Sequence, residues 1–208
     1  MERVLVLSPH SDDMEISCGG TVAKFIDEGY EVFSLVFSYA EQSITKEFKR
    51  FQTVIESSEA VKVLGVNTKW TVCGNFQVRS FPSRRQEILD ILIQAKKNIK
   101  PDIVLLPNSN DIHQDHQVIH NEGIRAFKHC TLLGYENIWN TMGKSNMTTY
   151  VSLTTEHIEK KIQAIECYKS QLYKKPDLID VMLSLAQVRG SEINKDYAEA
   201  FETVRSII

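Results

Sequence analysis

Two short polar motifs hold the residues of this chain that could do metal chemistry. The first, His10-Ser11-Asp12-Asp13, directly follows the apolar run Val4–Leu7. Adjacent carboxylates repel each other, and the end of a buried strand is a poor place for uncompensated charge. A cation held between His10 and the carboxylates would relieve that repulsion. The motif therefore predicts a binding site for a positive ion.

The second motif supplies more ligands of the same kind. Three of the six histidines follow the apolar run Asp102–Leu106 closely: His113, His116 and His120. Imidazole nitrogens and carboxylate oxygens form a mixed donor set that zinc accepts, and a catalytic zinc takes three protein ligands and one water. His10, Asp13 and one of His113 or His116 would complete such a set.

The two motifs can meet only if a sheet brings their strands together. Apolar runs typical of strands alternate along the chain with segments of helical periodicity, which favours an α/β fold with a mostly parallel sheet. In such sheets ligands bind beyond the carboxyl ends of the strands, and both motifs follow strand ends. The expected strands are Val4–Leu7, Glu31–Ser38, Lys69–Cys73, Asp102–Leu106, Leu132–Ile138 and Thr149–Leu153.

Helices are expected between and after these strands. Gly19-Gly20-Thr21 predicts a tight turn and a close helix start, and its backbone N–H groups could hold an anion. Thr155 is expected to cap a helix. The expected helical ranges are 22–29, 45–64, 82–99, 116–128, 155–168 and 178–188. The pattern predicts a three-layer α/β sandwich with a Rossmann-like sheet and one domain over residues 1–208.

Composition excludes several classes of partner. The net charge is −3 and there is no basic run, so nucleic acid is not an expected partner. No apolar stretch reaches membrane length, and the N-terminus lacks the pattern of a signal peptide. The four cysteines form no C-x-x-C pair, which is typical of free thiols in a reducing cytoplasm. We therefore expect a cytoplasmic protein without a transmembrane segment, and association into homo-oligomers stays open.

Two other functions fit part of this pattern. Two histidines and one carboxylate also form the facial triad of non-haem iron(II) enzymes, and His10-Ser11-Asp12 has the spacing H-x-[DE]. Those enzymes need a jelly-roll pattern of many short strands, which this chain lacks. A silent scaffold that binds zinc or sugar without turnover is the other alternative. It predicts a missing general base, whereas Asp12 is present.

The motifs resemble those of a known family. His10-Ser11-Asp12-Asp13-Met14-Glu15, followed by Gly19-Gly20-Thr21, is similar to the H-x-D-D-x-E…GGT signature of the PIG-L/LmbE-like zinc-dependent N-deacetylases. His113-Gln114-Asp115-His116 resembles the second motif, H-x-D-H, and the resemblance covers nearly the whole chain. Many members have Pro in place of Ser11 and Glu in place of Met14, so the chain departs from the pattern at these two positions.

The resemblance implies a role for each matching residue. His10, Asp13 and His116 would hold Zn²⁺, with Fe²⁺ as the alternative metal, and Asp12 would be the general base. His113 would face the substrate carbonyl. Asp115 would lie beside it, to keep the imidazole charged or to fix its orientation. The implied reaction removes an N-acetyl group from an N-acetylglucosamine-type conjugate linked to a nucleotide, a lipid or a small molecule.

Other polar and aromatic residues have less specific expectations. Glu15 could support the site from behind or cap the following helix. His120 lies one helical turn from His116, where it could support a ligand. Trp139, which follows a predicted strand, could stack on a sugar face, but core packing is its expected use. Four arginines lie in or near segments that could line a pocket, although surface ion pairs are the expected use of most of them: Arg50, Arg79, Arg84 and Arg85.

Overall fold

A computed structural model describes residues 1–68, 76–142 and 146–207. These residues form one six-stranded sheet in the order β2-β1-β3-β4-β6-β5. Strands β1 to β4 are mutually parallel, whereas β6 is antiparallel to β4 and to β5. The mostly parallel sheet is confirmed. The strands are β1 (Arg3–His10), β2 (Glu31–Ser38), β3 (Ile103–Pro107), β4 (Thr131–Tyr135), β5 (Met147–Leu153) and β6 (Tyr197–Arg205).

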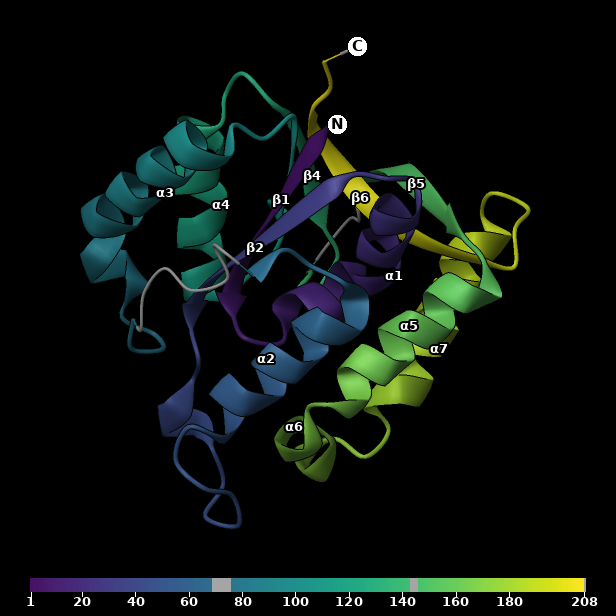
Figure 1. The fold of residues 1–208 in the computed structure, drawn as a ribbon, viewed down its shortest axis with the longest axis horizontal. Helices are drawn as coiled ribbons and strands as arrows, with labels where there is room; N and C mark the ends of the chain where they lie inside the picture. The colour runs from purple at the N-terminus through teal and green to yellow at the C-terminus, as the bar shows by residue number, and fades with distance from the viewer. Residues whose placement is uncertain (69–75, 143–145, 208) are drawn as a thin grey trace.

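Helices cover both faces of the sheet and make the three layers (Figure 1). The α-helices are α1 (Asp13–Asp27), α2 (Gln52–Leu64), α3 (Arg85–Ile99), α4 (Gln114–Ala126), α5 (Thr155–Glu166), α6 (Lys169–Lys174) and α7 (Leu178–Ser191), and the 3-10 helices are η1 (Glu41–Ser43) and η3 (Phe81–Arg84). No helix in the described ranges is long and apolar enough to cross a membrane.

Alternate side chains of β1 enter two different cores. Leu5 and Leu7 pack with residues of α3 and α4, whereas Val4 and Val6 pack with residues of α1, α2 and α5. Successive strand side chains point to opposite faces, so a strand buried on both faces is a continuous apolar run. This is why Val4–Leu7 carries no polar residue.

Several boundaries differ from the sequence-based expectation. Helix α1 begins at Asp13 rather than after Gly20, and α2 begins at Gln52 rather than near Thr45. Thr154, not Thr155, caps α5 by accepting a hydrogen bond from the His157 backbone N–H. Strand β6 was not expected, and the strand expected at 69–73 lies outside the described residues.

Strands β1 and β3 are hydrogen-bonded neighbours, with Val4 opposite Ile103 and Val6 opposite Leu105. Because they are parallel, their carboxyl ends lie at one edge of the sheet. Helix α1 leaves from the end of β1, and α4 follows the end of β3 after a short loop. The two polar motifs therefore meet at that edge.

A buried ion pair holds a kink in α1. Cys18 has non-helical dihedral angles, φ −144° and ψ 21°, and the backbone N–H groups of Gly20 and Thr21 donate to the Glu199 carboxylate. Lys161 Nζ lies 2.6 Å from the same carboxylate, and both side chains are buried. A Cβ at position 20 would lie 2.5 Å from Leu153 Cδ1 and 3.2 Å from Glu199 Oε1, so a larger residue there would require these side chains to move. The backbone N–H groups of the Gly19-Gly20-Thr21 segment were expected to be able to hold an anion. The anion that they bind is the Glu199 carboxylate of the same chain.

Replacing Glu199 by glutamine is expected to destabilise the fold by about 3–5 kcal/mol, the usual cost of removing one partner of a buried ion pair. The amide keeps an oxygen for the backbone N–H groups but leaves the Lys161 ammonium without a counter-charge. Chemical denaturation measures the loss. Glu159→Gln, at an exposed position of α5, is the control and should change stability by less than about 0.5 kcal/mol. Equal stability of the two variants would contradict this account.

Candidate metal centre and active site

Three side-chain atoms form a nearly equilateral triangle at the edge of the sheet. His10 Nδ1 and His116 Nε2 are 3.2 Å apart, and each lies 3.4 Å from Asp13 Oδ2. Ligand atoms about 2.0–2.1 Å from a tetrahedral zinc lie roughly 3.3 Å from one another. The three donors therefore match one face of a zinc coordination tetrahedron, which leaves the fourth position for water.

Each donor is fixed by the start or end of a regular element. His10 is the last residue of β1, Asp13 is the first residue of α1, and His116 lies in the first turn of α4. The His10 backbone N–H donates to Asp13 Oδ2 at 2.7 Å, which orients the carboxylate. Tyr168 donates from its hydroxyl to the Ser11 carbonyl and holds the turn between strand and helix.

Two further carboxylates form hydrogen bonds with the ring nitrogens of His10 and His116 that are not in the triangle. Asp111 Oδ2 lies 2.7 Å from His116 Nδ1, and Asp115 Oδ2 lies 3.2 Å from His10 Nε2. Metal-binding histidines commonly donate their second N–H to a carboxylate, which fixes the tautomer and the ring orientation. Asp111 was not singled out from the sequence. The sequence feature that could have identified it is its position two residues before His113, in the loop that follows β3.

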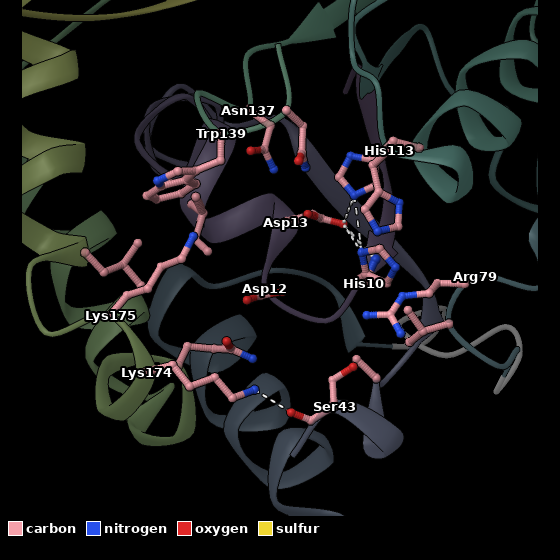
Figure 2. Close-up of a pocket in the computed structure, with 17 residues that line it drawn as sticks. His10, Asp12, Asp13, Ser43, Arg79, His113, Asn137, Trp139, Lys174 and Lys175 are labelled. Atoms are coloured by element: carbon pink, nitrogen blue, oxygen red, sulfur yellow. Dashed lines mark hydrogen bonds and ion pairs between the residues drawn. The ribbon is translucent and has the colours of Figure 1, made fainter. Parts of the chain in front are cut away.

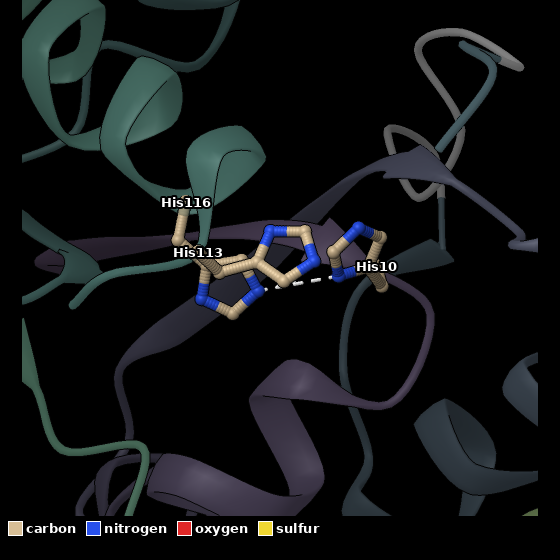
Figure 3. Close-up of side chains that lie close together, drawn as sticks. All are labelled: His10, His113 and His116. Carbon is tan, nitrogen blue, oxygen red and sulfur yellow. Dashed lines mark hydrogen bonds between the residues drawn. The ribbon is translucent and has the colours of Figure 1, made fainter. Parts of the chain in front are cut away.

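His113 lies beside the triangle rather than in it. The nitrogens of His10, His113 and His116 come within 4.8 Å of one another, and Figure 3 shows the three rings together. His113 caps α4, since its Nδ1 accepts a hydrogen bond from the Asp115 backbone N–H at 3.2 Å. Burial, followed by the positive charges of His10 and His116, lowers the pKa of His113. The imidazole is therefore neutral, with its proton on Nε2.

The Asp115 carboxylate serves other groups than His113. Besides His10 Nε2, it accepts backbone hydrogen bonds from Arg79 at 2.7 Å and from Phe81 at 3.4 Å. Asp115 contacts His113 with its backbone N–H, which donates to His113 Nδ1. This geometry places Asp115 where it orients His10 with its side chain and His113 with its main chain.

Asp12 and Asp13 are adjacent but electrostatically distinct. Burial, and then the charge of Asp13, raises the pKa of Asp12 to about 6. Burial also acts on Asp13, but the neighbouring His116 and His10 outweigh it and lower the pKa of Asp13 to about 2. For His10, burial is outweighed by hydrogen bonds to Asp115 and Asp13, which raise its pKa to about 10. The pocket floor thus stabilises positive charge.

A cavity of about 430 Å³ opens above the triangle. Asp12 lines it without being one of the three triangle residues, as Figure 2 shows. Trp139 also lines it and is 37% exposed, so the expectation of core packing is wrong for this residue. The sequence did not show that β4 ends at Tyr135 and leaves Trp139 in a loop.

The arginines divide into two groups. Arg50 lies 3.8 Å from Glu41, Arg84 pairs with Glu87, and Arg85 lies 2.5 Å from Glu122, so the expected ion pairs are confirmed for these three. Arg79 instead lines the cavity. It has a φ of 67°, in the left-handed region that costs energy for a side chain with a Cβ. Such strain is typical of functional positions.

The two remaining polar candidates, Glu15 and His120, are not part of the donor triangle. Burial raises the pKa of Glu15 to about 8, so its carboxyl is mostly protonated at neutral pH and adds little negative charge beside Asp12 and Asp13. His120 Nδ1 lies 2.7 Å from the Pro107 carbonyl oxygen. It therefore supports the end of β3 and makes no described contact with His116.

Comparison with known proteins agrees with this site. Residues 5–127 match the family described as PIG-L: GlcNAc-PI de-N-acetylase. The chain is 24% identical over 173 residues to the uncharacterized deacetylase YaiS of Escherichia coli (strain K12), which covers 80% of this chain and 90% of that protein. It is 23% identical over 214 residues to the diacetylchitobiose deacetylase of Thermococcus kodakarensis, which covers 97% of this chain and 74% of that protein.

Solved structures confirm the fold. The 4-carboxy-2-hydroxymuconate hydratase GalB of Pseudomonas putida KT2440 has a TM-score of 0.82 at 21% identity, over 100% of this chain and 98% of that one. At this identity the likeness concerns the fold alone. The curated relatives are deacetylases and so support a hydrolytic enzyme of the same kind.

Asp111→Asn is expected to raise the dissociation constant for zinc about 10–100-fold, which is the usual effect of losing the carboxylate behind a histidine ligand. Isothermal titration of metal-free protein with zinc measures the change. Asp180→Asn, at an exposed position of α7, is the control and should bind zinc as the wild type does. Unchanged affinity of Asp111→Asn would show that this carboxylate does not support the metal site.

His116→Ala is expected to abolish stoichiometric zinc binding, because it removes one corner of the triangle and the donor set drops to two. Metal analysis of the purified variant gives the result directly. Retained zinc at one ion per chain would move the ligand role to His113, whose nitrogens are the nearest alternative.

Proposed function

This chain belongs to the GlcNAc-PI de-N-acetylase family, and we propose that it is a zinc-dependent hydrolase that removes the N-acetyl group from an amino-sugar conjugate. One observation carries the proposal. Asp12, a carboxylate outside the ligand triangle, lines the cavity next to three donor atoms spaced for a tetrahedral metal. A metal site with an adjacent free base is what metal-assisted amide hydrolysis requires.

The chain's own residues share the work of the metal centre. We assign His10, Asp13 and His116 as the metal ligands. Bound zinc supplies Lewis acidity that lowers the pKa of water to about 7 and polarises a carbonyl. Fe²⁺ would accept the same donors, and metal replacement distinguishes the two ions.

Asp12 is the proposed general base. Asp12 directly precedes the first residue of α1, and its side chain lines the cavity apart from the three donor atoms. A pKa raised to about 6 keeps the carboxylate ionised at neutral pH and yet basic enough to take a proton from water. The same group then carries that proton to the leaving amine.

His113 is the proposed donor to the carbonyl oxygen as negative charge develops on it. Because Nδ1 is occupied by the helix cap, the Nε2–H is the atom available to the substrate. A neutral imidazole that donates one hydrogen bond fits the lowered pKa better than an imidazolium. Asp115 acts as a positioning residue for His10 and His113.

The cavity fits a sugar as the rest of the substrate. Its volume is within the range of small-molecule sites, and its wall presents both polar and aromatic groups. Asn137, Asn140 and Gln171 offer amide groups for hydroxyls, and Trp139 offers a ring face. Hydrolysis of the amide would release acetate and leave a free amine on the sugar.

Asp12→Asn is expected to keep zinc at wild-type stoichiometry and to lower the rate of acetate release by at least about 100-fold, as loss of a general base predicts. An acetate assay on N-acetylglucosamine conjugates, with metal analysis of the same samples, measures both quantities. Wild-type acetate release by this variant would refute the role of Asp12, and loss of zinc would instead make Asp12 a ligand.

The rate should also fall on the acid side, because the base must be ionised. Burial raises the pKa of Asp12 to about 6, and a bound cation acts in the opposite direction. We therefore expect kcat/KM for acetate release to decline below a midpoint at or below about pH 6. A midpoint well above pH 7 would show that another group, not Asp12, causes the decline of kcat/KM at acid pH.

A further inference from the structure

The cavity has two chemically different ends. Figure 2 shows Asp13, His10 and His113 towards one end, and Trp139, Lys174 and Lys175 at the opposite end, with Asp12 between the two groups. If the proposed function holds, the acetamide lies at the metal end. The part of the conjugate on the far side of the sugar then reaches the end formed by Trp139, Lys174 and Lys175, which we call the basic rim.

The two ends differ in their charged groups. Among the described residues that line the cavity, the only carboxylates are Asp13 at the metal end and Asp12 between the ends, and Arg79 adds a cation at the metal end. The basic rim carries two ammonium groups, from the last residue of α6 and the residue that follows it. A ligand that crosses the cavity thus meets net positive charge at its outer end.

The two lysines are aimed across the cavity mouth. Lys174 Nζ donates to the Ser43 carbonyl oxygen at 2.5 Å, and Lys175 Nζ lies 3.7 Å from the centroid of the Trp139 ring. Lysines at a helix end often only offset the helix dipole. These two side chains instead reach other segments, and within the described part of the chain neither forms an ion pair with a carboxylate.

We propose that the basic rim is a subsite for an anionic group, a phosphate or a carboxylate, on the part of the substrate opposite the N-acetyl group. Ammonium groups bind phosphate and carboxylate as point charges. The carbonyl of Ser43 and the ring of Trp139 carry no net charge, so a bound anion would supply the counter-charge that these contacts do not. This inference rests on the proposed function for the direction of the substrate, and it narrows the substrate to acidic amino-sugar conjugates.

The test compares acidic and neutral substrates of the same sugar. N-acetylglucosamine 1-phosphate, a carboxylate-bearing glycoside and the neutral methyl glycoside are assayed for acetate release by the zinc-loaded enzyme. The wild type should favour at least one acidic substrate by about tenfold or more in kcat/KM, as a hydrogen bond to a charged group predicts. The preference should weaken as NaCl is raised, because salt screens exposed charges. The phosphate and carboxylate arms identify which anion the rim prefers.

Variants of the two rim lysines test whether these residues cause the preference for the acidic substrate. Lys174→Gln and Lys175→Gln should each lower kcat/KM for the acidic substrate about tenfold, mostly through KM, and leave the neutral substrate within about twofold. Lys169→Gln is the matched control, because Lys169 is an exposed residue of α6 that does not line the cavity. Equal rates on acidic and neutral substrates, or the same loss in Lys169→Gln, would overturn the proposal.

A binding measurement keeps this test separate from the test of deacetylation. Zinc-loaded Asp12→Asn is titrated with N-acetylglucosamine 1-phosphate and with the methyl glycoside, with and without Lys174→Gln and Lys175→Gln. Tighter binding of the phosphate that disappears in the lysine variants would support the subsite, even if no substrate releases acetate and the proposed function fails. Equal binding of both ligands in all variants would refute the subsite.

Discussion

The site depends on one electrostatic constraint, which is that a carboxylate and two imidazoles must be held at mutual distances of 3.2–3.4 Å. No single element can supply all three groups. The fold meets the constraint by placing β1 beside β3, so that one strand end and the first turns of two helices converge. The helix that follows β1 begins at Asp13 itself, and this early start separates Asp13 from Asp12. The parallel order of the central strands is therefore a requirement of the site.

Carboxylates and main-chain groups behind the triangle extend this constraint into the surrounding structure. Asp111 and Asp115 fix the two ring orientations, and Asp115 in turn is held by the backbone of Arg79. Arg79 adopts φ 67° at this point, so part of the folding free energy is used to bring its N–H to Asp115 and its side chain to the cavity. Displacement of one of these side chains would therefore disturb several hydrogen bonds at once.

Sequence patterns were sufficient where local chemistry decides the structure. Apolar runs located β1 to β3, and polar residues at their ends located the site, since side chains at the carboxyl edge of a parallel sheet converge. Long-range contacts decided the rest. Strand β6 is rich in alanine and glutamate, which are weak strand formers, and it is stabilised by pairing with β4 and β5 and by the ion pair of Glu199. Asp111 and Trp139 gained their roles only from the loops that surround the cavity.

The two ends of the cavity are formed by different parts of the chain. The residues of the metal end, together with Asp12, lie within residues 5–127, the segment that matches the family: His10, Asp12, Asp13, His113 and His116. Trp139, Lys174 and Lys175 lie beyond it, in a loop after β4 and at the end of α6. Relatives of this fold include deacetylases and a hydratase, so the fold by itself does not determine the reaction or the substrate. In this chain the segment that matches the family supplies the proposed metal ligands, and the segments after it supply the charge at the cavity mouth. The end of α6 brings two lysines to the cavity, and selection between conjugates of one sugar would then depend on charge far from the scissile amide.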